Sequence, residues 1–296
     1  TTQALNLDFD KDFLGLFPTL NLVYELSENS NISLGYNRRI NRPRSWFINP
    51  FPSRSSETNI FQGNPDLNPS YASALDLGFM IKNRQITLTT SVYGQYETES
   101  FERIQEETGE VTDNGIPVIR TIPINLSTNQ RIGFELGILY NPAKWLGFNS
   151  SFNFFQFETQ GIYNDVDFGA KNVSWFTRSG VKINLPGEIN TQTNLFYRGP
   201  NQNAQTKTKG IASLDFATSK DLFDEKLSIS FNVNDLLNSR KRQSYTLTDS
   251  FESDSVFQWR VRTWTVGVLY RFNQKKSERD RKNERSGGFD DEGFEG

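Results

Sequence analysis

Hydrophobic and polar residues alternate with a period of two along the stretch from Trp264 to Phe272. Even positions carry Trp, Val, Val, Tyr and Phe, whereas odd positions carry Thr, Gly, Leu and Arg, so one face of a strand would be apolar and aromatic. Nine residues at ~3.3 Å each, tilted by about 45°, cover roughly the 25 Å apolar band of a membrane. With Trp264 at one interface and Tyr270 and Phe272 at the other, the pattern predicts a transmembrane β-strand.

The same alternation recurs in ten earlier stretches, which makes eleven predicted strands. Their connections are alternately turns of a few residues and loops of about 10 to 30 residues, so all the long connections fall at one end. Outer-membrane barrels show this asymmetry, with short periplasmic turns and long extracellular loops. The predicted strands cover residues 14–26, 31–39, 71–82, 86–96, 131–140, 146–154, 173–185, 189–198, 212–219, 227–234 and 264–272.

Isolated charges on the polar face of these strands indicate that this face meets water or protein, because each charge would cost ~2–4 kcal/mol near the lipid midplane. Eleven is an odd number, and an open sheet would leave two unpaired edges in hydrocarbon. The sequence therefore predicts an all-β fold, an antiparallel transmembrane β-barrel of which this chain supplies the C-terminal half of roughly 22 strands. A complete twelve-strand barrel is the alternative. The charges in question are Arg39, Asp76, Arg131, Glu135, Arg178, Lys182 and Asp215.

Composition agrees with a barrel and narrows the chemistry. A mean hydropathy of -0.60 alongside 14% aromatic residues fits strands whose lipid-facing residues are matched by polar ones. The chain has no cysteine and no histidine, which removes disulfides, the commonest metal ligand and the commonest general base. A net charge of -3 argues against nucleic acid as a partner. No signal-peptide pattern opens the chain, so Thr1 is not expected to be the native start.

Three stretches carry a resemblance to a known family. In the last predicted strand, Thr265, Gly267, Tyr270 and Phe272 match the β-signal pattern that the outer-membrane barrel-assembly machinery reads. The other two stretches are residues 36–43 (YNRRINRP) with 48–51 (INPF) and 63–69 (GNPDLNP), and residues 232–240 (NVNDLLNSR). With them, nearly the whole chain resembles the Bacteroidota-type outer-membrane β-barrel family, within the TonB-dependent receptor superfamily.

That resemblance implies partners and an activity that the residues do not show by themselves. It implies an N-terminal signal sequence, a plug domain and a segment that contacts the TonB complex, in addition to the other barrel half that the strand count calls for. It leaves open whether a surface lipoprotein is a further partner. The implied activity is energised import of a scarce, bulky nutrient such as a siderophore, a glycan or a peptide. A structural barrel that anchors a surface complex without transport is the alternative. No cofactor and no enzymatic activity are expected.

Several residues are candidates for contact with a ligand or with the plug. Arg38, Arg39, Asn41 and Arg42 would grip an anionic ligand or plug carboxylates, or else hold the loop that follows them. The charges on the polar strand face are candidates for the same contacts. Four aromatic residues of the following loop would stack on a ligand or fold the loop on itself, namely Trp46, Phe47, Phe51 and Phe61.

Other features suggest chemistry less strongly than they suggest solvated structure. Residues 108–114 contain Glu110, Asp113 and Asn114, which would bind calcium or form a solvated turn. The acidic residues between positions 97 and 107 suggest either a hydrolytic carboxylate pair or a strand that extends above the membrane. Residues 273–296 carry basic and then acidic residues with almost no apolar ones, so they are expected to form a disordered periplasmic tail beyond a barrel spanning residues 1–272.

Overall fold

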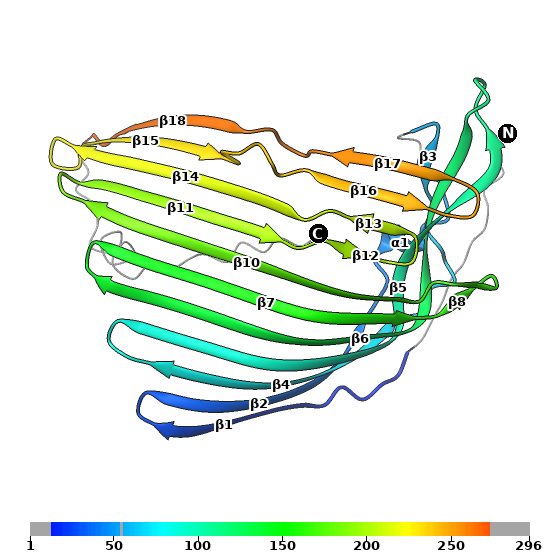
Figure 1. Cartoon of the computed structure of the whole chain (residues 1–296), viewed down its shortest axis with the longest axis horizontal. Helices are drawn as coiled ribbons and strands as arrows, with labels where there is room; N and C mark the ends of the chain where they lie inside the picture. The colour runs from blue at the N-terminus through cyan, green and yellow to red at the C-terminus, as the bar shows by residue number, and fades with distance from the viewer. Residues whose placement is uncertain (1–12, 54–55, 273–296) are drawn as a thin grey trace.

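The computed structural model describes residues 13–53 and 56–272, and the predicted tail lies outside them. Within this part of the chain, eleven strands follow one another in chain order across one sheet, each antiparallel to the next (Figure 1). The predicted strand number and the antiparallel fold class are confirmed. The strands are β1 (Thr19–Ser27), β2 (Ser30–Asn41), β4 (Ser70–Lys82), β5 (Ile86–Val111), β6 (Pro117–Ala143), β7 (Leu146–Gln160), β10 (Ala170–Leu185), β11 (Ile189–Arg198), β14 (Ile211–Leu222), β15 (Leu227–Asn234) and β18 (Thr263–Tyr270).

Smaller elements gather at the end of the sheet that carries the long loops, on the right of Figure 1. Strand β3 (Asn59–Phe61) pairs in parallel with β6, and β8 (Ile162–Tyr163) pairs with β9 (Val166–Asp167). A second sheet, here called the external sheet, consists of β12 (Asn201–Gln202), β13 (Thr206–Thr208), β16 (Arg242–Leu247) and β17 (Glu252–Phe257). The helix α1 (Ser45–Ile48) is a single turn, and no helix in the described ranges is long and apolar enough to cross a membrane.

The register of the strands puts polar residues on one face and apolar residues on the other. Asp76 of β4 pairs with Gly35 of β2 and with Tyr93 of β5, so these three positions lie on the same face as the other predicted polar positions. On the opposite face, Leu77 of β4 and Ile132 of β6 remain 54% and 65% exposed although both strands are central in the sheet. No second layer of described residues covers this apolar face, so it is the lipid-facing one.

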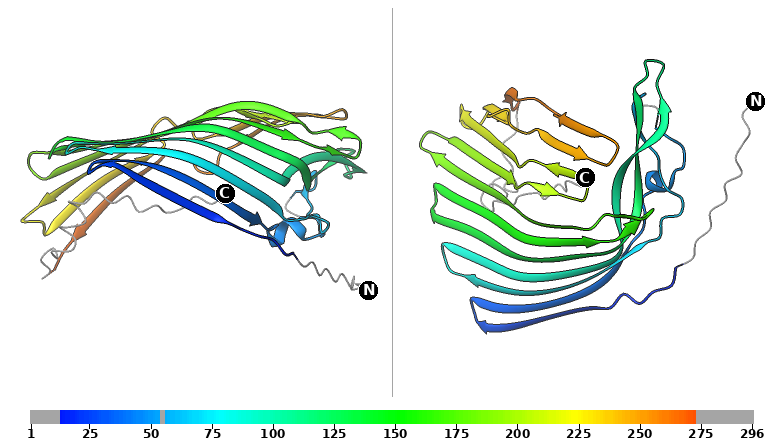
Figure 2. Two further views of the ribbon diagram at one scale, coloured as in Figure 1. Left: turned by 90° about the horizontal axis from the view of Figure 1, so that it is seen from below. Right: turned by 45° about the vertical axis from the view of Figure 1, so that its right-hand side comes forward.

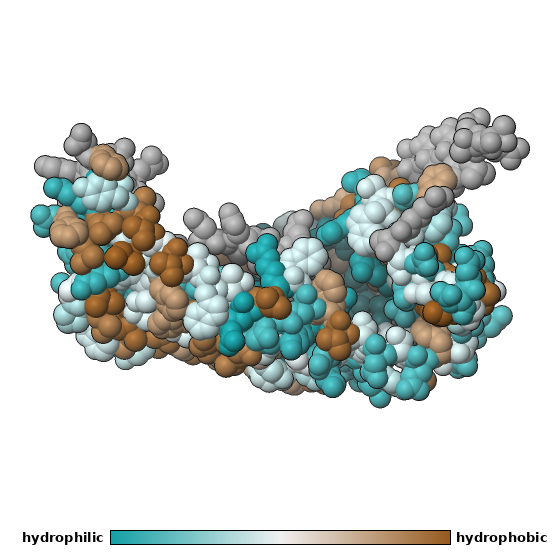
Figure 3. Space-filling view, turned by 90° about the horizontal axis from the view of Figure 1, so that it is seen from above, coloured by the Kyte–Doolittle hydropathy of each residue, from teal (hydrophilic) through white to brown (hydrophobic). Residues whose placement is uncertain are grey.

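The main sheet is curved, and its two edge strands bend toward the same side. Figure 2 shows β1 and β18 on the inner side of an arch whose crest is formed by the middle strands. Strands β1 and β18 do not pair with each other, so the described strands form an open trough and not a closed barrel. In Figure 3, hydrophobic side chains gather over the half of the molecule that holds β15 and β18.

Several strand boundaries differ from the sequence-based expectation. The first strand begins at Thr19 and not at Leu14, directly after Pro18, which has no backbone N–H to give to a ladder. Strands β5 and β6 continue far past the predicted ends at residues 96 and 131, and they pair up to Val111 and Pro117. Above the lipid no strand face has to be apolar along its whole length, so the regular alternation that marks a membrane strand is lost there.

The best-buried hydrophobic cluster lies in this long-loop part of the molecule and not in the membrane-spanning part. Ile104 of β5 packs with Ile124 and Leu126 of β6, and Phe168 from the segment between β9 and β10 completes the cluster. Each of the four keeps at most 6% of its surface exposed. The extended β5–β6 hairpin is therefore a packed part of the fold that holds loops in place.

Candidate functional site

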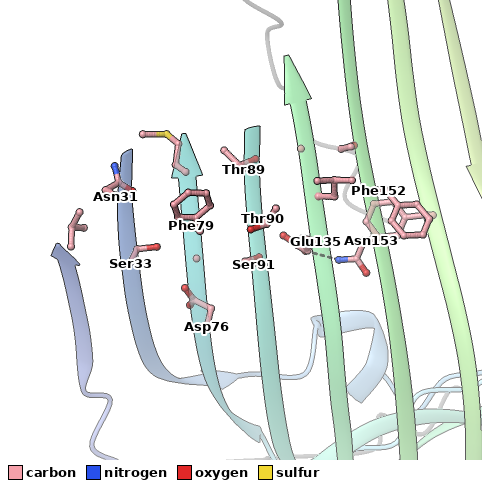
Figure 4. Close-up of a pocket in the computed structure, with 17 residues that line it drawn as sticks. Asn31, Ser33, Asp76, Phe79, Thr89, Thr90, Ser91, Glu135, Phe152 and Asn153 are labelled. Atoms are coloured by element: carbon pink, nitrogen blue, oxygen red, sulfur yellow. Dashed lines mark hydrogen bonds between the residues drawn. The ribbon is translucent and has the colours of Figure 1, made fainter. Parts of the chain in front are cut away.

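Polar side chains from five neighbouring strands, β2, β4, β5, β6 and β7, line a hollow of about 620 Å³ on the concave face of the sheet. Figure 4 shows the side chains of Asp76, Glu135 and Asn153 on one face of β4, β6 and β7, with Ser33 and Thr89 beside them. Because every second residue of each strand points to this face, the hollow is a direct product of the period-two pattern.

A hydrogen-bonded chain crosses this face between β5, β6 and β7. The Tyr93 hydroxyl donates to Asn153 Oδ1 at 3.2 Å, and Asn153 Nδ2 donates to Glu135 Oε1 at 2.5 Å. The Tyr93 ring lies so close to Gly133 that a Cβ at position 133 would come within 2.5 Å of the ring atoms. The glycine therefore lets Tyr93 lie flat across β6 and reach Asn153.

The other predicted charges share the concave face but have different partners. The guanidinium of Arg131 lies 4.9 Å from the Phe155 ring centroid, and that of Arg178 lies 5.6 Å from the Phe196 ring centroid. Lys182 borders a separate depression between β10 and β15. Asp215 Oδ1 accepts a hydrogen bond from the backbone N–H of Asp235 at 2.7 Å, which joins the middle of β14 to the residue that follows β15.

The predicted arginine-rich stretch at the end of β2 splits between the two faces of the sheet. Arg38 faces outward, with its guanidinium 5.8 Å from the centroid of Tyr71. Arg39, on the concave face, and Arg42, beyond the strand, are exposed. Asn41 Nδ2 donates to Glu97 Oε1 at 3.3 Å, and the same oxygen accepts a hydrogen bond from Ser70 Oγ at 2.6 Å. Asn41 and Glu97 thus join three strands above the membrane.

Three of the four predicted loop aromatics pack on one another. The ring centroids of Trp46 and Phe47 are 4.2 Å apart, and those of Trp46 and Phe61 are 5.0 Å apart. Phe47 also contacts Phe101 of β5 edge-on at 6.1 Å. Phe51 stays 59% exposed beside this cluster. The loop folds on itself and against β5, and stacking of a ligand on the cluster remains a prediction.

The family-like segments 48–51 and 63–69 hold this loop closed. The backbone N–H of Gly63 donates to the carbonyl of Asn49 at 2.8 Å, and the N–H of Asn64 donates to the carbonyl of Phe47 at 2.6 Å. Gly63 is required sterically, because a Cβ there would come within 2.5 Å of the Asn49 carbonyl oxygen. The motif therefore specifies a backbone clamp around the aromatic cluster.

Asn125 joins this loop to the bend in β5, and the sequence alone did not single it out. Its Oδ1 accepts from the N–H of Asn68 at 2.8 Å, and its Nδ2 donates to the carbonyls of Asn68 at 3.0 Å and Glu99 at 2.7 Å. Glu99 has a φ of 55°, the left-handed conformation that few non-glycine residues adopt. The β5–β6 hairpin bends at this residue, and three hydrogen bonds hold the bend in place.

The third family-like segment forms a capped turn after β15. Asp235 is 4% exposed, and its two carboxylate oxygens accept from the backbone N–H groups of Ser239 at 3.0 Å and Arg240 at 2.9 Å. Asn238 Oδ1 accepts from Gln258 Nε2 at 2.9 Å and from the N–H of Arg262 at 3.1 Å. These contacts join both ends of the loop between β15 and β18.

The remaining predicted features have structural placements. Thr265 and Gly267 of the β-signal face the polar side of β18, whereas Tyr270 faces outward and meets Phe272 edge-on at 4.6 Å. Residues 108–114 form part of the β5–β6 hairpin end, where Thr112 Oγ1 accepts a hydrogen bond from the N–H of Ile116. Throughout the described ranges, no group of three or more Asp and Glu side chains is placed to hold a metal ion.

Sequence reasoning missed Tyr93, Asn153 and Arg103. An aromatic residue on the polar face, next to a strand that carries glycine, is a signal that would have pointed to Tyr93. Arg103 lies on β5, with its guanidinium carbon 4.9 Å from the Trp46 ring centroid. This contact depends on how the external loops fold, and no local pattern in the sequence marks it.

With this geometry in place, comparison with known proteins identifies the class. The model of the outer membrane protein beta-barrel family matches residues 1–270, and the chain belongs to that family. It therefore lies in the outer membrane, with lipid against its apolar face. No curated protein sequence matches the chain.

Solved structures show the same fold at low sequence identity. The siderophore receptor PirA from Pseudomonas aeruginosa aligns with a TM-score of 0.54 and 16% identity over 78% of this chain and 40% of that one. The copper transporter OprC aligns with a TM-score of 0.58 and 13% identity over 86% of this chain and 39% of that one. The ferric enterobactin receptor PfeA aligns with a TM-score of 0.53 and 13% identity over 85% of this chain and 40% of that one. This chain thus spans about two fifths of the length of the solved proteins that it matches.

Proposed function

We propose that this chain forms the C-terminal part of the barrel wall of a TonB-dependent receptor that imports a bulky, scarce nutrient. The open, polar trough carries this proposal. Its concave face offers charges and hydrogen-bonding groups to a plug and a ligand, while its convex face is suited to lipid. The named receptors and the transporter of the same fold support a transport role over a purely structural one.

The proposal includes partners beyond the lipid bilayer. Further strands would pair with the free edges of β1 and β18 to close a barrel of roughly 22 strands, because unpaired backbone groups are strongly unfavourable in hydrocarbon. A plug would fill the barrel, with Asp76 and Glu135 among its contacts, and would connect to the TonB complex. The barrel-assembly machinery would read the β-signal of β18, and a surface lipoprotein would cover the long loops. The chain would bind and pass its ligand without changing it chemically.

Growth and uptake tests distinguish import from a structural role. A strain that lacks the gene is compared with the same strain carrying the intact gene, on siderophore-bound iron, glycans and peptides as sole sources. We expect one nutrient class to require the gene, and its uptake to stop when the proton gradient is dissipated. Unchanged growth and uptake on every class, together with loss of a surface complex, would favour the structural anchor instead.

A further inference from the structure

The outermost strand of the external sheet, β17, has one edge to which no described strand is bonded. The external sheet runs in the order β12-β13-β16-β17, and within the described ranges β17 pairs with β16 alone. All six residues of β17 are exposed. An unpaired edge presents a row of backbone N–H and C=O groups that a further strand can extend.

The hydrogen bonds of β16 show which backbone groups of β17 point to this edge. The N–H of Leu247 donates to the carbonyl of Gln205 at 2.9 Å, so the odd-numbered residues of β16 bond toward the β13 side. In an antiparallel sheet the direction alternates along a strand, so the even-numbered residues of β16 bond to β17. Their partners are Ser253, Ser255 and Phe257. The backbone groups at the edge therefore belong to Glu252, Asp254 and Val256.

The edge of β17 continues the edge of the membrane strand β18. Figure 1 shows these two strands one after the other along the upper margin of the molecule, with β16 and β15 on their inner side. The N–H of Arg271 donates to the carbonyl of Lys226 on the β15 side, so the even-numbered residues of β18 point away from β15. One further strand can therefore meet both edges in turn.

Side chains fix the link between β17 and β18, residues 258–262, from the β15 side. Asn238 Oδ1 accepts from Gln258 Nε2 at 2.9 Å and from the N–H of Arg262 at 3.1 Å. The Arg262 guanidinium also donates to the carbonyl of Leu236 at 3.2 Å. Trp259 and Val261 of the same link stay 78% and 64% exposed. The link thus holds β17 in line with β18 and leaves apolar side chains uncovered.

Strands of this wall do continue above the membrane. Strands β5 and β6 have 26 and 27 residues, and they stay paired up to Val111 and Pro117. The stretch from β17 through the link to β18 covers residues 252–270, which is shorter than either of those strands. A neighbour as long as β5 would therefore pair with β18 in the membrane and reach β17 above it.

We propose that the strand that closes the barrel against β18 continues above the membrane and pairs with the edge of β17. The external sheet then spans the seam of the barrel. Recognition is through the main chain, with the N–H and C=O groups of Glu252, Asp254 and Val256 bonded to the added strand, and its side chains cover Trp259. This inference rests on the proposed closure of the barrel and adds to it a partner for the external sheet.

Hydrogen exchange at single-residue resolution tests the inference in the full-length, monomeric protein in detergent. In an open edge strand, β16 protects Ser253 and Ser255, whereas Glu252, Asp254 and Val256 exchange freely. We expect all five amides to be protected, with exchange at the three even-numbered residues slowed on the order of a hundredfold relative to an unstructured peptide of the same sequence. Free exchange at these three residues beside protected Ser253 and Ser255 would overturn the inference.

The same measurement separates the inference from the proposed closure. The amides of Trp264 and Val266 in β18 point away from β15 and report the membrane part of the seam. Protection of both, with free exchange at the edge of β17, would retain the closed barrel and reject its extension. Free exchange in both strands would reject closure as well. Protection of β17 found only in an oligomeric fraction, or lost on removal of residues 273–296, would assign the edge to a second copy or to that segment and would also overturn the inference.

A pair of proline substitutions gives an independent test. Asp254→Pro removes an N–H that points to the edge and keeps the bonds to β16, a change that a strand with an open edge tolerates. We expect exchange at Glu252 and Val256 to become about tenfold faster, because the added strand loses a hydrogen bond. Ser255→Pro, which removes a bond to Ser244 of β16, is the positive control for disruption of the external sheet. Unchanged exchange at Glu252 and Val256 in Asp254→Pro would overturn the inference.

Discussion

At the residue scale, a few polar side chains determine the shape of the loops. Asn125 and Asn238 each form two or more hydrogen bonds with groups of other segments, and the Asp235 carboxylate accepts two from backbone N–H groups of its own turn. The segments containing Asp235 and Gly63 were recognisable from the sequence as family-like, but the hydrogen bonds by which they cap a turn and close a loop were not. A hydrogen bond between residues 57 positions apart, such as that from Asn68 to Asn125, leaves no local pattern to read.

Removal of the Asp235 carboxylate should loosen the turn after β15. In Asp235→Ala the N–H groups of Ser239 and Arg240 lose their acceptor, and we expect a local loss of about 1–3 kcal/mol. Hydrogen exchange at these two amides measures the change. Asp249→Ala, an exposed position in the same loop, is the matched control and should leave their exchange rates unaltered. Equal protection in both variants would refute the capping role.

Glu102 should make the docking of the external sheet dependent on pH. Burial raises its folded-state pKa, although the hydrogen bond from Asn203 opposes the rise. The folded state therefore holds the proton more tightly than the unfolded state. The stability from this group is full below the unfolded pKa of about 4.3 and is lost as the pH rises through the higher folded value.

A Glu102→Gln variant tests this linkage, because it keeps an acceptor for Asn203 and removes the buried charge. We expect slower hydrogen exchange around Asn203 and Gln205 than in the wild type at neutral pH, with the difference vanishing below about pH 4. Glu110→Gln, an exposed position on the same strand, serves as the comparison and should behave like the wild type. Faster exchange in Glu102→Gln at neutral pH would show that the charge stabilises the contact.

At the element scale, the alternation of residues predicted which face of each strand is polar. It succeeded from β1 to β18 because lipid imposes a strict apolar requirement on one side of a strand and not on the other. It gave no polar face for the upper half of β6, for β3 or for the external sheet, where lipid does not require an apolar face. The extension of β5 above the membrane was one of the two readings of the acidic residues between positions 97 and 107, and it is confirmed. There the pairing of Ser100 with Leu126 and of Thr206 with Thr246 depends on long-range packing.

Two glycines on neighbouring strands allow a controlled test of the polar face. Gly133→Ala places a methyl group within 2.5 Å of the Tyr93 ring, whereas the Cβ in Gly94→Ala meets nothing within 4 Å. We expect Gly133→Ala to displace Tyr93, break its hydrogen bond to Asn153 and lower the unfolding temperature, at a cost of about 1–3 kcal/mol. Gly94→Ala should be neutral. Equal unfolding temperatures for both variants would mean that Tyr93 does not depend on the close approach.

At the scale of the whole molecule, the apolar outer surface requires lipid. No second layer of the described chain covers the residues on the convex face, and the same surface in water would be a large exposed apolar patch. The lengths of the strands and the period-two alternation of apolar and polar residues were sufficient to predict a lipid-facing surface, because a bilayer has a fixed thickness. The identity of the ligand was beyond that reasoning, since it depends on loops without a periodic signal.

A pair of arginine substitutions tests which side meets lipid. Leu77→Arg puts a charge on the convex face of β4, and we expect it to cost about 2–4 kcal/mol and to reduce assembly into the membrane. Ser91→Arg puts the same side chain on the concave face of β5, where it should be tolerated. The amount of heat-modifiable protein in isolated membranes reports both effects. Normal assembly of Leu77→Arg alongside failure of Ser91→Arg would reverse the assigned faces.

The bend at Glu99 has a consequence for how proteins of this barrel family could exchange their external loops. Because Asn125 secures the bend to residue 68 and the clamp at Gly63 secures the aromatic cluster, segments 42–69 and 97–130 form a single inheritable unit. If only one of the two segments were grafted onto a related barrel, the hydrogen bonds between the segments would lose one of their two partners. Recombination between relatives would therefore preserve the loop structure only when both segments are transferred together.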